Sequence, residues 1–136
     1  MTETKGNVFD LEDKPGVWFD LDGGGRVKLK NIGIDEYLDI LDKTTKKVPF
    51  VKEVDGKQRV FTYEEENERL RAILTNDVAI QDWENLLDKN GKPIPCTKEN
   101  KTLLMIKSSV FRDFCNEKLK TLAEAEAEHE KAAEKN

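Results

Sequence analysis

Apolar and polar positions alternate singly in the first part of the chain. In residues 26–30 apolar and charged side chains follow one another with a period of two, which is typical of a half-buried β-strand. The run 17–21 precedes it across residues 22–25, whose three glycines allow a tight reversal. These segments predict a first antiparallel β-hairpin.

A second hairpin is predicted farther along the chain. Residues 48–54 and 58–63 flank Asp55-Gly56, a dipeptide favoured in two-residue turns. Pro49 lacks a backbone donor, so its strand is expected at a sheet edge.

Two helices are predicted on either side of this hairpin. The first covers residues 35–44, with the carboxylate of Asp35 capping its first turn. The second covers roughly residues 64–78, because Thr62 and Glu65 have the spacing of a capping box and apolar residues then repeat at helical spacing. Residues 79–83 are interpreted as a segment leading out of this helix. The apolar side chains on one side of the first helix are Ile34, Tyr37, Leu38 and Leu41.

The last third of the chain is predicted to be helical. Asn90-Gly91, with prolines on its C-terminal side, predicts a turn before it. Thr97 and Ser109 are the predicted caps of two successive helices, and the second helix carries an apolar face. From Ala123 onward alternating Ala and Glu favour a helix without an apolar stripe, so a solvated extension is expected.

These elements predict an α+β fold with two antiparallel hairpins in the N-terminal half and helices packed on one sheet face. The 136 residues are the length of one domain, and Leu, Ile, Val and Phe, about a quarter of them, support one modest core. We expect a single domain over residues 1–122 with a loose arm at 1–16, followed by an acidic Ala/Glu-rich tail at 123–136.

Charge and composition narrow the classes of function. The net charge of -5 disfavours binding to nucleic acid or to an anionic membrane surface. The sequence contains neither a long apolar run nor a basic-then-apolar leader, which predicts a cytoplasmic protein. Cys96 and Cys115 lack the spacing of a disulfide framework and are expected to be reduced, packed thiols.

Catalytic chemistry is not indicated. The single histidine, His129, lies in the Ala/Glu tail, where no apolar surroundings tune its pKa. Residues 23–25 lack the spacing of a phosphate-binding loop and lead into a strand. The sequence therefore predicts a protein that is not an enzyme and that holds no cofactor or metal.

A family resemblance appears in the second half of the chain. Residues 80–85 (IQDWEN), the turn 87–100 (LDKNGKPIPCTKEN), the following helix pair and the Ala/Glu-rich end resemble the tail assembly chaperones of long-tailed, non-contractile bacteriophages and their prophages. Residues 17–29 are also similar to the opening hairpin of that family.

The resemblance implies a non-catalytic role in virion morphogenesis. Such chaperones hold the long helical tape-measure protein and recruit tail-tube subunits, so the tape-measure and major tail-tube proteins are the implied partners, and a homo-oligomer is also allowed. The alternative is a structural virion component such as a tail terminator or connector subunit.

The candidate partner-binding residues are five large apolar side chains. They either bind a partner helix or form the core of the domain itself, and the sequence leaves both readings open. They are Trp83, Phe111, Phe114, Leu119 and Leu122.

Overall fold

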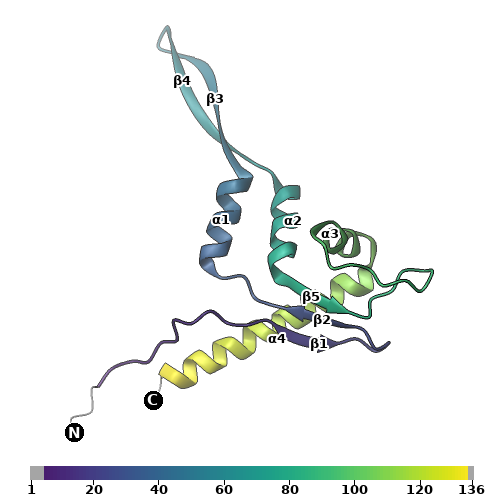
Figure 1. Cartoon of the computed structure of the whole chain (residues 1–136). Helices are drawn as coiled ribbons and strands as arrows, with labels where there is room; N and C mark the ends of the chain where they lie inside the picture. Colours follow the sequence, from purple (N-terminus) through teal and green to yellow (C-terminus); the bar gives the residue numbers. More distant parts are fainter. Residues whose placement is uncertain (1–4, 135–136) are drawn as a thin grey trace.

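The structure is a computed structural model in which residues 5–134 are described (Figure 1). The predicted arm and tail also include residues 1–4 and 135–136, which lie outside the described residues. The elements in chain order are β1 (Val17–Asp20), β2 (Arg26–Leu29), α1 (Ile34–Thr44), β3 (Thr45–Val54), β4 (Lys57–Glu66), α2 (Glu68–Ala79), β5 (Ile80–Glu84), α3 (Lys98–Lys107) and α4 (Ser109–Glu134). The predicted α+β class, with strands in the N-terminal half and a helical C-terminal half, is confirmed.

A three-stranded antiparallel sheet has the order β1-β2-β5. The strand β5 includes most of residues 79–83, the predicted segment leading out of the second helix, so that prediction is wrong. The register of β5 against β2 shifts between Lys28 and Leu29, and this irregularity puts Ile80 and Trp83 on the buried side although they are three positions apart. A bulge of this kind disrupts the period of two by which a strand is recognised in sequence.

The core lies between this sheet and α4, which runs across it in Figure 1. Val27 and Leu29 of β2 are fully buried, as is Cys115 of α4. Burial of apolar surface between the two layers is the main stabilising contribution to the fold. The remaining buried members of the cluster are Ile80, Trp83 and Phe111.

The second hairpin forms a separate two-stranded sheet. It leaves the ends of α1 and α2, which lie side by side, and projects away from the rest of the molecule (Figure 1). Its strands extend to residues 45–66, beyond the predicted 48–63. The predicted edge position of Pro49 agrees with this two-stranded sheet.

The longer β4 overturns the predicted start of the following helix. Thr62 and Glu65 are strand residues, and α2 begins at Glu68. Its cap is Asn67, whose side-chain oxygen accepts a hydrogen bond from the backbone N–H of Leu70 at 3.1 Å. Pairing with β3 across the whole of β4 outweighs the local capping preference.

Two other predicted caps are displaced by one or two residues. Gly33, not Asp35, precedes α1, and the Glu36 carboxylate accepts a hydrogen bond from the Gly33 N–H at 3.1 Å. Before α4 the Ser108 hydroxyl accepts from the Phe111 N–H at 3.1 Å, so Ser109 is already helical. The predicted cap at Thr97 is confirmed by its 3.2 Å bond from the Asn100 N–H.

The N-terminal arm and the C-terminal part of α4 lie side by side and line a common hollow (Figure 1). Residues 5–16 have no regular secondary structure, and α4 continues past Ala123 as far as Glu134 without a break. The Asn31 side-chain amide donates to the Glu126 carboxylate at 3.1 Å, which ties the extension to the loop after β2. Most described side chains of the extension are exposed.

Candidate interaction surface

The amphipathic stripe of α1 is left uncovered. Ile34 is 77 % exposed, Tyr37 49 % and Leu38 53 %, whereas the side of α1 that packs against α2 buries Ile40 and Thr44. These three exposed residues follow one another at helical spacing and define the surface called here the α1 stripe. An apolar helix face is ordinarily buried against a neighbour, so the α1 stripe is a candidate contact surface for another chain.

The projecting hairpin carries a second apolar surface. Cross-strand pairing places Phe50 opposite Phe61 and Val48 opposite Tyr63, on one face of the two-stranded sheet. The ring of Phe50 stacks on that of Phe61 with centroids 5.7 Å apart and lies 5.8 Å from that of Tyr63. These three residues are the aromatic face of the hairpin.

The opposite face of the hairpin carries an exposed valine pair among polar and charged residues. Val51 and Val60 pair with each other and are mostly exposed. A two-stranded hairpin with no core behind it is marginally stable in water. With exposed apolar side chains on both faces, the hairpin is a second candidate contact surface.

The base of the hairpin is fixed to α2 by Arg71. Its guanidinium donates to the hydroxyls of Thr44 and Thr45 at 3.1 and 3.2 Å, and it lies 3.6 Å from the Glu66 carboxylate. Because Thr44 ends α1 and Thr45 begins β3, this group holds the two helices and the hairpin together at their junction.

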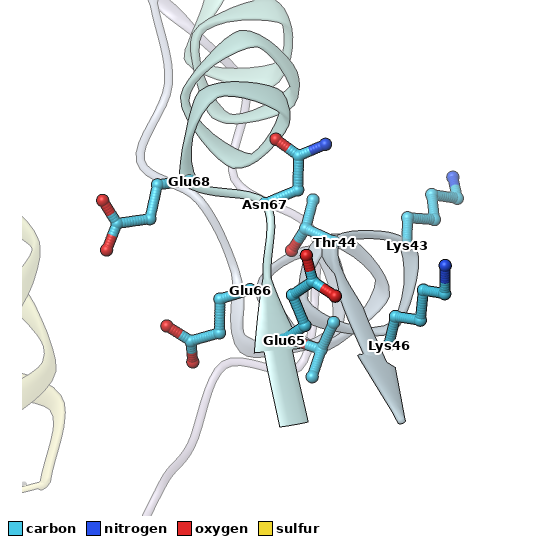
Figure 2. A pocket seen from close by; sticks show the side chains of 8 residues that line it. Lys43, Thr44, Lys46, Glu65, Glu66, Asn67 and Glu68 are labelled. Atoms are coloured by element: carbon cyan, nitrogen blue, oxygen red, sulfur yellow. The ribbon is translucent and has the colours of Figure 1, made fainter. Parts of the chain in front are cut away.

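A polar hollow of about 560 Å³ lies at the same junction (Figure 2). Figure 2 shows the carboxylates of Glu66 and Glu68 on one side of it and the amines of Lys43 and Lys46 on the other. Acid–base catalysis needs groups that converge on one point. These side chains diverge, so the hollow is better described as the open angle between hairpin and helices than as a substrate site.

The five partner-binding candidates lie in or against the core. Trp83, Phe111 and Leu122 are buried, and Phe114 and Leu119 are partly buried against the core cluster. The indole of Trp83 donates to the Ile94 carbonyl at 2.6 Å and meets the Phe111 ring edge-on. In the folded chain, these five side chains therefore form part of the core or pack against it. The α1 stripe and the hairpin are among the parts of the molecule whose apolar side chains are exposed instead.

Both cysteines are free, and their environments differ. Cys96 is partly buried, and burial raises its thiol pKa. Cys115 is fully buried in the core, and burial raises its pKa from 9.0 to about 12. The Cys115 thiolate is therefore strongly disfavoured in the native state, and thiolate is the reactive form.

We expect a thiol reagent at pH 8 to modify Cys96 in the native protein and Cys115 only at the rate of unfolding. The variant Cys96→Ser isolates the second thiol for the measurement. Because the folded pKa of Cys115 is raised, its contribution to the free energy of unfolding is complete below about pH 9 and declines as the pH rises further. Rapid modification of Cys115 without unfolding would contradict this burial.

Among residues 5–134, no cluster of three or more histidine, cysteine or carboxylate side chains is arranged to hold a metal ion. Within the same part of the chain, the helices are too short or too polar to cross a membrane.

The fold and its surfaces define a small α+β protein with an uncovered amphipathic helix and a projecting hairpin. The model of the YdaY prophage protein family matches residues 32–136, so the chain belongs to that family. The match includes α1, the second hairpin and all of the C-terminal half, and begins after β2. No curated protein and no solved structure shows a significant match to the chain.

Proposed function

We propose that this prophage protein is a non-catalytic tail assembly chaperone, which binds the tape-measure protein in the host cytoplasm and helps recruit tail-tube subunits. The proposal combines the family membership with the resemblance of residues 80–100 to such chaperones. The observation that carries it is the exposed α1 stripe.

The α1 stripe suits a helical partner. Side chains at helical spacing form ridges that fit the grooves of another helix, and the tape-measure proteins implied by the resemblance are long and helical. The exposed set includes an aromatic residue, Tyr37, of the kind that anchors protein interfaces. A contact surface of three side chains is small, and small interfaces bind weakly, which suits a partner that is later released to the growing tube.

The test is capture of the tape-measure product of the same prophage by the purified chain. We expect Tyr37→Gln with Leu38→Gln to reduce capture at least tenfold, because the variant removes the apolar contact while the side chains stay exposed. The matched control is Ile106→Gln with Val110→Gln, which removes two exposed apolar residues from α3 and α4. Equal capture by wild type and the α1 variant would refute the role of the stripe.

Mass spectrometry of purified virions separates the chaperone from the alternative, a structural tail component. The chaperone proposal expects the protein in lysates of assembling cells and not in finished particles. A stoichiometric amount in the particle would favour a tail terminator or connector subunit.

A further inference from the structure

Among residues 5–134, no strand lies beside the outer edge of β4. In the two-stranded sheet β4 pairs on one side with β3, and all ten of its residues are exposed. The backbone donors and acceptors along such an edge are free to pair with another strand. The outer edge of β3 is less suited to this, because Pro49 of β3 lacks a backbone donor.

The sequence of β4, KQRVFTYEEE, is complementary to itself when reversed. Lys57 and Arg59 lie near its start, and residues 64–66 at its end are all glutamate. In an antiparallel pair of identical strands the start of one lies beside the end of the other. Each basic half of β4 would then face an acidic half of a second copy.

In one register of this antiparallel pair, opposite charges lie opposite each other and so do aromatic residues. When the pair is centred on Thr62, Arg59 lies opposite Glu65 of the partner subunit, and Phe61 lies opposite Tyr63 of the partner subunit. All these positions lie on the aromatic face, because side chains two apart share a face of a strand. Opposite charges and aromatic rings are both favourable cross-strand pairs.

Arg59 forms no ion pair with a carboxylate among the described residues. Arg59 pairs directly with Lys52 across the strands, and like charges in this position are unfavourable. Lys52 likewise forms no ion pair within residues 5–134. Within the same hairpin, Glu65 of β4 lies opposite Lys46 of β3.

We propose that two copies of the protein join through their β4 edges into a four-stranded antiparallel sheet with the order β3-β4-β4-β3, centred on Thr62. The aromatic faces of both hairpins then lie on the same side of the sheet and form one continuous apolar surface. The proposal concerns the chain alone and does not rest on the chaperone role.

Charge reversal tests the register. We expect wild type to show a monomer–dimer equilibrium in analytical ultracentrifugation, and Arg59→Glu to weaken the dimer about tenfold, since both symmetry-related pairs become repulsive. Arg59→Glu also removes the repulsion from Lys52 within its own hairpin, so a weaker dimer does not reflect an unfolded hairpin. The triple variant Arg59→Glu, Glu65→Arg and Lys46→Glu is expected to restore dimerisation, because the two charges across the interface are exchanged and residue 65 keeps an opposite charge across its own hairpin.

Arg69→Glu, an equal change of charge at an exposed position of α2, serves as the control and should leave the dimer unchanged. A protein that stays monomeric up to about 1 mM would overturn the proposal, since a contact weaker than that is not a stable interface. A dimer that Arg59→Glu does not weaken, or that the triple variant does not restore, would also overturn it. Loss of dimer in the Tyr37 and Leu38 variant alone would assign the contact to the α1 stripe instead.

Discussion

Trp83→Ala is expected to lower the free energy of unfolding by about 3–5 kcal/mol, as truncation of a large core aromatic residue typically does. The Trp83 side chain is only 6 % exposed. It extends from β5 and meets the ring of Phe111 in α4. Its indole N–H also satisfies the Ile94 carbonyl, so truncation leaves a cavity and removes a hydrogen bond at the same site. Equilibrium unfolding in urea measures the loss.

Trp18→Ala provides the matched control. Trp18 is half-buried, and its ring contacts the guanidinium of Arg26 at 4.2 Å on the sheet. Removing a cation–π contact at such a partly exposed site costs about 1 kcal/mol. If both tryptophan variants lost the same stability, Trp83 would not be the core residue that the structure shows.

Lys101→Ala is expected to lower the free energy of unfolding by about 2–3 kcal/mol, below the roughly 3–5 kcal/mol typical of a fully buried ion pair that loses one partner. The ammonium of Lys101 donates to both the backbone carbonyl and the carboxylate of Asp77 at 3.1 Å, which joins α3 to the end of α2. The Lys101 side chain is 9 % exposed, whereas that of Asp77 is 37 % exposed, so solvent compensates the orphaned carboxylate in part.

Lys101→Met separates the two contributions. Methionine keeps most of the buried stem, so we expect it to recover the packing and lose only the polar contacts. Thermal unfolding followed by circular dichroism ranks the three proteins as wild type, Lys101→Met and Lys101→Ala in falling order of stability. A methionine variant no more stable than the alanine variant would show that the ion pair, and not the packing, accounts for the effect.

Several elements that depend on neighbouring residues alone were predicted correctly, although two local helix caps were displaced by one or two residues. The turn at Asp55-Gly56 forms with both residues at positive φ, as a two-residue hairpin turn requires. The cap at Thr97 also follows from a contact only three residues away. The first hairpin has the same local basis, since its strands pair across one short turn.

Elements that depend on distant contacts were predicted less well. The strand β5 exists because β2 pairs with it, and about fifty residues separate the two in sequence. Its bulge conceals the alternation by which a strand is recognised. The start of α2 was displaced for a related reason, since β4 continues as far as β3 remains beside it.

The candidate interaction surface was likewise predicted only in part. The amphipathic pattern of α1 and the apolar residues of the hairpin are visible in the sequence, as is the apolar face of the last helix. Periodicity identifies which residues share a face, but it does not identify which face meets a neighbour. The face of α4 packs on the sheet, whereas the α1 stripe and the hairpin remain exposed.

The sequence by itself determined the α+β class, both hairpins, the helical C-terminal half and the absence of a recognisable catalytic motif. These features follow from side-chain period and turn chemistry, which act over a few residues. The tertiary structure decided that Trp83 and Phe111 lie in the core and that the α1 stripe and the residues of β4 are exposed. Which surfaces are covered depends on contacts between residues far apart in the chain, and such contacts exist only after the whole chain has folded.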